Sequence, residues 1–112
     1  MAERNPMKQL ILAALVILAL GGEAWAVDGN DLHSWCFGKT GGYFEGQCFG
    51  YVIATSDLTR HFGEFCAPDG MLRAQAVDVV RKYLKGHPES RHKTASNLVY
   101  RAFKEAFPCP KK

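Results

Sequence analysis

Four cysteines, Cys36, Cys48, Cys66 and Cys109, constrain this chain more than any other feature of its sequence. An even number of cysteines in a short exported chain is typical of structural disulfides. A zinc site needs paired ligands at short spacing and a redox centre needs Cys-x-x-Cys, and these cysteines lie too far apart for either. Three pairings are possible. We favour Cys36–Cys48 with Cys66–Cys109, since the first pair brackets a Gly-rich loop and the second ties the ends of two predicted helices.

The first 26 residues are typical of a secretory signal peptide. Arg4 and Lys8 provide the positive start, an unbroken apolar run follows from Leu10 to Leu20, and small residues at Ala24 and Ala26 suit signal peptidase. The alternative is a retained anchor, but the run is too short to cross about 30 Å of hydrocarbon. We therefore expect cleavage after residue 26 and an exported mature domain of residues 27–112.

The composition indicates one small globular domain. Of the 112 residues, 47% are hydrophobic and 22% are charged, which argues against disorder. The net charge of +3, without a dense basic run, predicts no nucleic-acid partner. Because so short a mature domain has a marginal core, its stability is expected to depend on the two disulfides. In the chain-entropy model they stabilise the fold by about 3 and about 4 kcal/mol.

Apolar residues spaced three and four apart predict an all-α fold, a small bundle of about four helices. A short first helix contains Leu32 and Cys36, with Asp28 or Asn30 as its cap. The other helices are expected at residues 46–65, 71–85 and 94–107. No segment alternates with period two, so no strand is predicted.

Each predicted helix has an expected buried face. In the second helix a stripe of small residues, Gly46, Gly50 and Ala54, predicts close packing of another helix. The other expected faces are Cys48, Val52, Thr55, Thr59, Phe62 and Cys66 in the second helix, Leu72, Ala76, Val79, Val80, Tyr83 and Leu84 in the third, and Ala95, Leu98, Val99, Ala102, Phe103, Ala106 and Phe107 in the fourth. Gly86 is expected to end the third helix in a left-handed conformation.

No catalytic motif is found in the sequence. The histidines do not form a zinc-protease motif, and there is neither a Gly-x-Ser-x-Gly elbow nor a complete phosphate-binding loop. With all four thiols assigned to disulfides, we predict a binding protein that is not an enzyme and holds neither metal nor cofactor.

Three stretches of the chain carry a family resemblance. They are CFGYVIATSDL from Cys48, FCAP from Phe65, and QAVDVVRKYLKGHPESRHKTASNLVYRAFKEAFPC from Gln75 to Cys109. The most specific pieces are KYLKGHPESRH and AFPC. From about Leu32 to Cys109 the chain resembles the periplasmic Rap/Tai immunity proteins, which protect bacteria against amidase effectors of type VI secretion.

The resemblance implies a helical homodimer in the periplasm that binds a cell-wall amidase arriving from a neighbouring cell. Inhibition would be steric, since a protruding segment would fill the active-site cleft, and no cofactor would be needed. Such interfaces depend on a few anchored aromatic or arginine side chains. The candidates are Tyr43 and Phe44 in a Gly-rich loop at 38–46, and Glu89, Arg91 and His92 in a polar connector at 87–93.

Both candidate segments also have a purely structural interpretation. Tyr43 and Phe44 can pack over the Cys36–Cys48 bridge, and the connector can be an ordinary solvated loop. The sequence also departs from the family pattern at the third helix. Family members often have Val-Thr there, with the Thr and Gln75 forming a capping box, whereas this chain has Met71-Leu72. The cap is therefore expected from Asp69 or Gly70.

Two other functions remain open at this stage. One is a periplasmic acid-stress chaperone of the HdeA-like kind, which is also small, helical and disulfide-bearing. Such a chaperone loses structure as its carboxylates protonate, and two disulfides with few acidic groups make that switch a poor fit. The other is an accessory binding domain for a cell-wall enzyme of the same cell. After signal cleavage, no contact with a membrane is expected.

Overall fold

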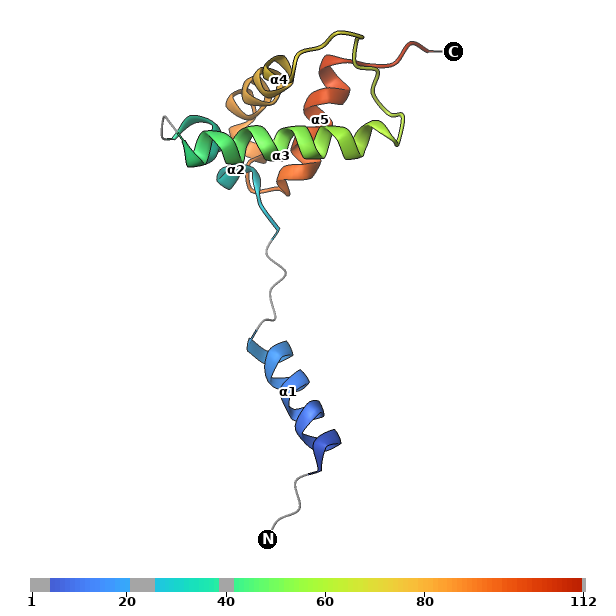
Figure 1. Ribbon diagram of the computed structural model, residues 1–112. Coiled ribbons are helices and arrows are strands. Elements are labelled where there is room, and N and C mark those ends of the chain that lie inside the picture. Colours follow the sequence, from blue (N-terminus) through green and yellow to red (C-terminus); the bar gives the residue numbers. More distant parts are fainter. Residues whose placement is uncertain (1–4, 21–25, 39–41, 112) are drawn as a thin grey trace.

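The protein is described by a computed structural model covering residues 5–20, 26–38 and 42–111. Its helices in chain order are α1 (Pro6–Leu20), α2 (Gly29–Phe37), α3 (Tyr43–Arg60), α4 (Arg73–Gly86), a 3-10 helix (Pro88–Ser90) and α5 (Ala95–Ala106). The described ranges contain no strand, only an isolated bridge between Asp28 and Thr94. The all-α prediction, with four helices after the N-terminal segment, is confirmed (Figure 1).

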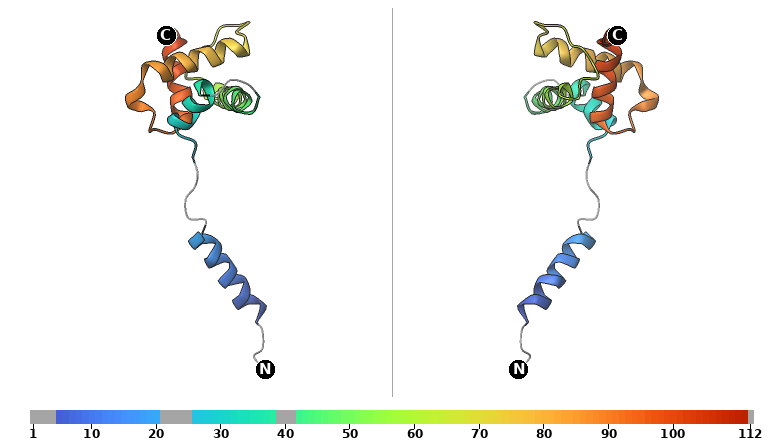
Figure 2. Two further views of the ribbon diagram at one scale, coloured as in Figure 1. Left: turned by 90° about the vertical axis from the view of Figure 1, so that its left-hand side faces the viewer. Right: turned by 90° about the vertical axis from the view of Figure 1, so that its right-hand side faces the viewer.

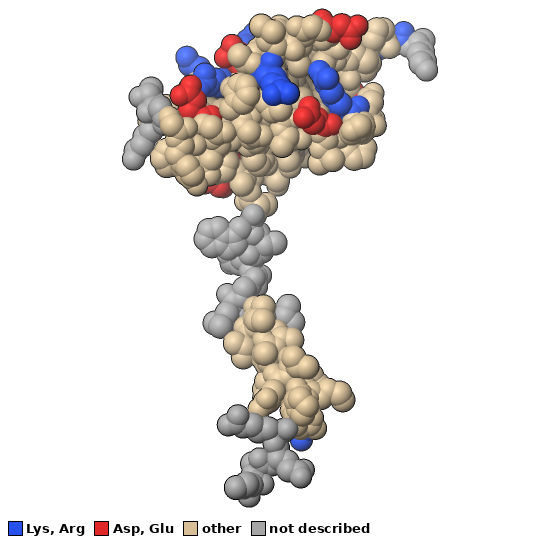
Figure 3. All heavy atoms as spheres, viewed as in Figure 1, with Lys and Arg blue, Asp and Glu red and all other residues tan. Residues whose placement is uncertain are grey.

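Helix α1 stands apart from the other helices in Figure 1 and corresponds to the apolar core of the expected signal peptide. Its described side chains are exposed, and Figure 3 shows almost no charged atoms on it. No helix among the described residues is long and apolar enough to cross a membrane. Residues 24 and 25 of the expected cleavage motif lie outside the described residues.

Helices α2 to α5 pack around one hydrophobic core (Figures 1 and 2). Phe103 of α5 is fully buried and its ring stacks on that of Phe65, with the ring centroids 5.3 Å apart. The other buried apolar residues are Leu32, Cys36, Cys48, Val52, Ala76, Val77, Val80, Leu84, Ala95, Leu98, Val99 and Ala102.

Both predicted disulfide pairings are confirmed. Cys36–Cys48 joins the end of α2 to the first half of α3, with a Cα–Cα distance of 5.1 Å. Cys66–Cys109 joins the segment after α3 to the segment after α5, with a Cα–Cα distance of 4.8 Å. The amide of Cys66 also donates a hydrogen bond to the Phe107 carbonyl at 2.8 Å. The covalent links therefore hold the first half of α3 to α2 and the segment after α3 to the C-terminal segment.

The prediction for the second helix was wrong at both ends. Helix α3 begins directly after Gly42, whose φ is +67°, and ends at Arg60, shortly before Gly63, which also has φ +67°. Glycine tolerates this left-handed conformation, which interrupts a helix. Tyr43 and Phe44 consequently lie in the first turn of α3 and not in a loop. Residues 39–41 of the expected Gly-rich loop lie outside the described residues.

The buried faces of α3 and α4 also needed correction. Phe62 is 67% exposed and Leu72 is 69% exposed, because both lie outside the helices that were expected to bury them. Val77 takes the core position instead. The stripe of Gly46, Gly50 and Ala54 is exposed, and a Cβ at either glycine would meet nothing within 4 Å. No helix of the described chain packs closely there.

The helix termini differ from expectation as well. Asp28 caps α2 as predicted. At α4 the N-cap position is Leu72, and neither Asp69 nor Gly70 provides a cap. Gly86 is the last residue of α4 and does not have a positive φ. Helix α5 keeps the predicted face from Ala95 to Phe103, although Ala106 is exposed.

Candidate functional site

The connector between α4 and α5 is an ordered segment held against the start of α2. The amide of Gly29 donates to the Lys93 carbonyl at 2.9 Å, and the amide of Ala95 donates to the Val27 carbonyl at 2.8 Å. A Cβ on Gly29 would lie 2.6 Å from the Arg91 carbonyl oxygen. Only glycine therefore allows the connector backbone to approach α2 so closely.

Arg91 holds the connector from within. Its Nε donates a hydrogen bond of 2.9 Å to the Leu84 carbonyl near the end of α4. A charge-assisted bond of this kind also suits the negative end of a helix dipole. Pro88–Ser90 form the 3-10 turn in front of it. Glu89 and His92 are exposed on the connector, while Arg91 is half-buried. The connector thus presents the Glu89 and His92 side chains on a fixed backbone.

Tyr43 and Phe44 form the second candidate segment, at the start of α3. Tyr43 is 72% exposed, and its ring meets that of Phe44 edge to face with centroids 5.4 Å apart. Gln47 donates from Nε2 to the Tyr43 hydroxyl at 3.3 Å. This geometry presents an exposed aromatic ring on a helix next to the Cys36–Cys48 bridge.

The fold does not bring the two candidate segments together. The connector packs on the first residue of α2, whereas the bridge to α3 leaves from Cys36 near its last residue. A helix rises about 1.5 Å per residue, so the length of α2 separates them. Figure 2 shows the orange connector projecting on one side of the bundle and the start of α3 on the other. A flat partner surface would therefore contact only one of the two segments at a time.

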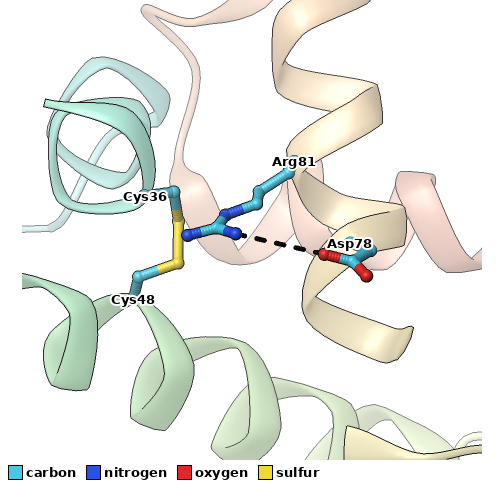
Figure 4. Close-up of a disulfide and its surroundings, with 4 residues drawn as sticks. All are labelled: Cys36, Cys48, Asp78 and Arg81. Atoms are coloured by element: carbon cyan, nitrogen blue, oxygen red, sulfur yellow. Dashed lines mark ion pairs between the residues drawn. A yellow bond between two sulfur atoms is a disulfide. The ribbon is translucent and has the colours of Figure 1, made fainter. Parts of the chain in front are cut away.

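Sequence reasoning missed Arg81. Its guanidinium reaches from α4 towards the Cys36–Cys48 disulfide (Figure 4). Its Cζ lies 5.8 Å from the centroid of the Phe37 ring, and its Nη1 lies 4.0 Å from Asp78 Oδ1. In the sequence, Arg81 looked like an ordinary basic residue near a helix C-terminus. A cation over an aromatic ring stabilises by about 0.5–1 kcal/mol at a partly exposed site, so this cluster supports the disulfide-linked end of the bundle.

A hollow of about 210 Å³ beside the start of α4 was also missed. It lies between α3 and α4 and is lined by Ile53, Ser56, Asp57, Arg60, Met71, Leu72, Arg73 and Ala76. The sequence did indicate that the start of α4 has no side-chain cap, because position 72 is not a Ser, Thr, Asp or Asn.

The part of the chain that the structure describes offers no candidate metal centre. No group of His, Cys, Asp or Glu side chains among the described residues could hold a metal ion. In Figure 3, acidic and basic side chains are intermixed on the face that carries α3 and α4. A mixed surface of this kind suits specific protein recognition better than steering of a highly charged polymer.

Together, the disulfide-linked bundle and its anchored connector define a small all-α domain suited to binding another protein. The family of Rap1a immunity proteins matches residues 28–109, which span all four helices of the bundle and both disulfides. The chain belongs to this family, as the resemblance indicated. No curated protein matches the chain in sequence.

Proposed function

We propose that this protein is a periplasmic immunity protein that binds a peptidoglycan amidase delivered by type VI secretion and blocks its active site. The observation that carries the proposal is the immunity-family match over residues 28–109. The N-terminal apolar segment supports export, and both disulfides suit an oxidising compartment. The protein would act as an inhibitor by binding alone, without a cofactor.

The connector is the segment we assign to the cleft of the amidase. Its backbone is fixed by hydrogen bonds to α2 and by the bond from Arg91 to Leu84. A fixed segment loses little conformational entropy on binding, and this favours affinity. The exposed Glu89 and His92 would contact the enzyme. Arg91 would position the connector from behind.

The direct experiment measures binding and inhibition of an amidase effector from the same organism. Replacing both Glu89 and His92 by Ala should raise Kd at least about 30-fold, equivalent to about 2 kcal/mol, if they are hot-spot residues. The matched control is Asp69→Ala, an exposed acidic residue in the turn before α4. Tyr43→Ala tests the alternative segment at the start of α3.

Each result has a defined meaning for the proposal. Unchanged inhibition by the connector variant with a loss in Tyr43→Ala would move the contact to α3. Failure of the wild-type protein to bind any amidase would overturn the amidase proposal. Suppression of aggregation of many proteins at low pH, without one tight partner, would instead indicate the chaperone.

The homodimer and the export step are separate parts of the proposal. Light scattering on the purified protein should give twice the monomer mass at micromolar concentration. Mass spectrometry of the periplasmic fraction should give a chain beginning at Val27. A monomer would remove the dimer from the proposal, and a cytoplasmic, uncleaved chain would remove export.

A further inference from the structure

The two disulfides differ in their access to solvent. Cys36 and Cys48 are 5% and 1% exposed, and the Arg81 guanidinium reaches towards their bridge (Figure 4). Cys66, by contrast, is exposed and Cys109 is half-buried. A disulfide is reduced when a thiolate attacks one of its sulfur atoms, so the rate depends on access to that sulfur. A dissolved thiol can therefore reach the second bridge, but not the first, while the protein stays folded.

The segment that contains Cys66 has few other anchors in the bundle. It runs from residue 61 to residue 72, between α3 and α4. Phe65 is its one buried residue, and the ring of Phe65 stacks on that of Phe103. The Cys66 amide donates a hydrogen bond to the Phe107 carbonyl at 2.8 Å. The disulfide therefore reinforces a small number of noncovalent contacts.

We propose that Cys66–Cys109 is a redox-sensitive clasp, which a dithiol opens while Cys36–Cys48 stays closed. The cysteines of the clasp are 43 residues apart in the sequence, and α4, the connector and α5 lie between them. A bridge that closes so long a loop removes much conformational entropy from the open chain. Exposed disulfides are more readily reduced than buried structural ones. The clasp does not depend on which partner the protein binds.

The clasp opens by two thiol–disulfide exchanges. One thiolate of the dithiol attacks Sγ of the more exposed Cys66 and forms a mixed disulfide, and Cys109 leaves as a thiolate. Lys111, two residues further on, favours this thiolate through its positive charge. The second thiolate of the dithiol then attacks the dithiol's own sulfur in the mixed disulfide and releases Cys66. Both released thiolates take protons from water. The dithiol loses two electrons and becomes a disulfide, and the clasp gains them.

Opening the clasp loosens one end of the bundle and leaves the other end linked. Residues 61–72 and the chain after α5 then keep only noncovalent contacts, whereas Cys36–Cys48 still joins α2 to α3. If Phe65 leaves its site, the fully buried Phe103 loses its stacking partner. Local opening of this kind needs less free energy than global unfolding. The reduced protein is therefore expected to open at the clasp while α2 stays packed.

The first experiment measures the order in which the two disulfides are reduced. The purified oxidised protein is treated with dithiothreitol at neutral pH for increasing times, and free thiols are blocked with N-ethylmaleimide. Peptide mass spectrometry should show label on Cys66 and Cys109 at least about ten-fold faster than on Cys36 and Cys48. Equal rates, or the opposite order, would overturn the proposal.

The same reaction in a denaturing concentration of guanidinium chloride is the control for the fold. All four cysteines are accessible in the unfolded chain, so the two reduction rates should then agree within about three-fold. A ten-fold difference that persisted in denaturant would contradict the proposal. It would mean that the residues next to each cysteine, and not exposure in the folded protein, set the order.

The second experiment measures what the clasp holds. Hydrogen exchange is compared between the oxidised protein, the selectively reduced and blocked protein, and the variant Cys66→Ser with Cys109→Ser. Without the clasp, peptides covering residues 61–72 and 103–109 should exchange at least about ten-fold faster, and peptides covering α2 should not change. The matched control is Glu64→Gln with Lys111→Gln, which alters two exposed residues next to the same cysteines and should exchange like the wild type.

Two results of the exchange experiment would overturn the clasp. Unchanged exchange at residues 61–72 would show that the noncovalent contacts hold this segment without the disulfide. Faster exchange throughout the bundle, α2 included, would show that the bridge supports the whole fold and does not open one end of it. Because the selectively reduced wild type starts from the folded protein, these results can be read even if the serine variant does not fold.

Discussion

The N-termini of α2 and α4 are two helix starts in one small bundle, and they are built in opposite ways. At α2 the Asp28 carboxylate accepts from the Asp31 amide at 2.8 Å, and the Asp31 carboxylate accepts from the Asp28 amide at 3.3 Å. The connector then covers this end through Gly29. At α4 no side chain caps the helix, and Arg60 and Arg73 flank it.

The difference shows that the same backbone chemistry is met by side chains at one helix start and by no side chain at the other. Every helix begins with amides that lack an intrahelical acceptor. Where the protein provides the acceptors itself, as at α2, the helix start becomes part of the folded frame. At α4 no side chain that the structure describes provides such an acceptor. The following predictions test this contrast.

The largest effect is expected at Gly29, where the connector packs most closely against the start of α2. Gly29→Ala places a methyl group 2.6 Å from the Arg91 carbonyl oxygen, so the connector or α2 must shift. Overpacking of this kind costs about 1–3 kcal/mol, which urea unfolding measures. Gly50→Ala is the control, because a Cβ there meets nothing. It should stabilise α3 by about 0.5–1 kcal/mol. Equal stability of the two variants would refute the close packing at Gly29.

The two helix starts should respond to cap substitutions with opposite signs. Asp28→Ala removes a formed capping box and should lower the free energy of unfolding by about 1 kcal/mol. Leu72→Thr adds a missing cap and should raise it by about the same amount. Chemical denaturation of the two variants beside the wild type measures both changes. A loss in both would mean that α4 already has its donors satisfied.

The smallest expected effect is a pH dependence of stability that comes from His33 in α2. Burial, and then the positive charge of Arg91, lower the pKa of His33 from its ordinary value of 6.5. Below pH 6.5 the unfolded chain therefore binds more protons at this residue than the folded chain does. Stability should fall as the pH decreases from about 6.5 through the lower folded-state pKa.

The test of His33 compares the wild type with His33→Gln. The variant should lose less stability than the wild type between pH 7.5 and the acid limit of folding. NMR titration of the His33 ring should give a pKa below 6.5. Since His61, His87 and His92 remain in both proteins, the difference between the two curves belongs to His33. Parallel curves would show that Arg91 and burial leave this histidine unperturbed.

Local patterns were sufficient to predict much of the architecture. The three- and four-residue spacing from Ala95 to Phe103 requires one buried helix face, and the structure buries it. The Asp28 cap depends only on residues within one turn. The choice of Cys36–Cys48 and Cys66–Cys109 followed from which predicted helix ends each pair would tie, and both bridges are present.

The errors occurred where local pattern and tertiary packing disagree. Leu72 and Phe62 match helical spacing, but Gly63 and the turn before α4 place both residues outside the helices and in solvent. Tyr43 and Phe44 were assigned to a loop because four glycines precede or flank them. The glycine at position 42 instead marks the start of a helix.

The sequence by itself indicated the fold class, the family and the favoured disulfide pairing, because helix periodicity, cysteine spacing and family motifs are properties of the chain in order. Only the tertiary structure decided that Arg91 braces the connector, that Arg81 lies beside a disulfide, and that Gly29 packs against the connector backbone. The physical reason is that these groups come from different helices. Their distances depend on how α2, α3, α4 and α5 pack, and no local pattern encodes that packing.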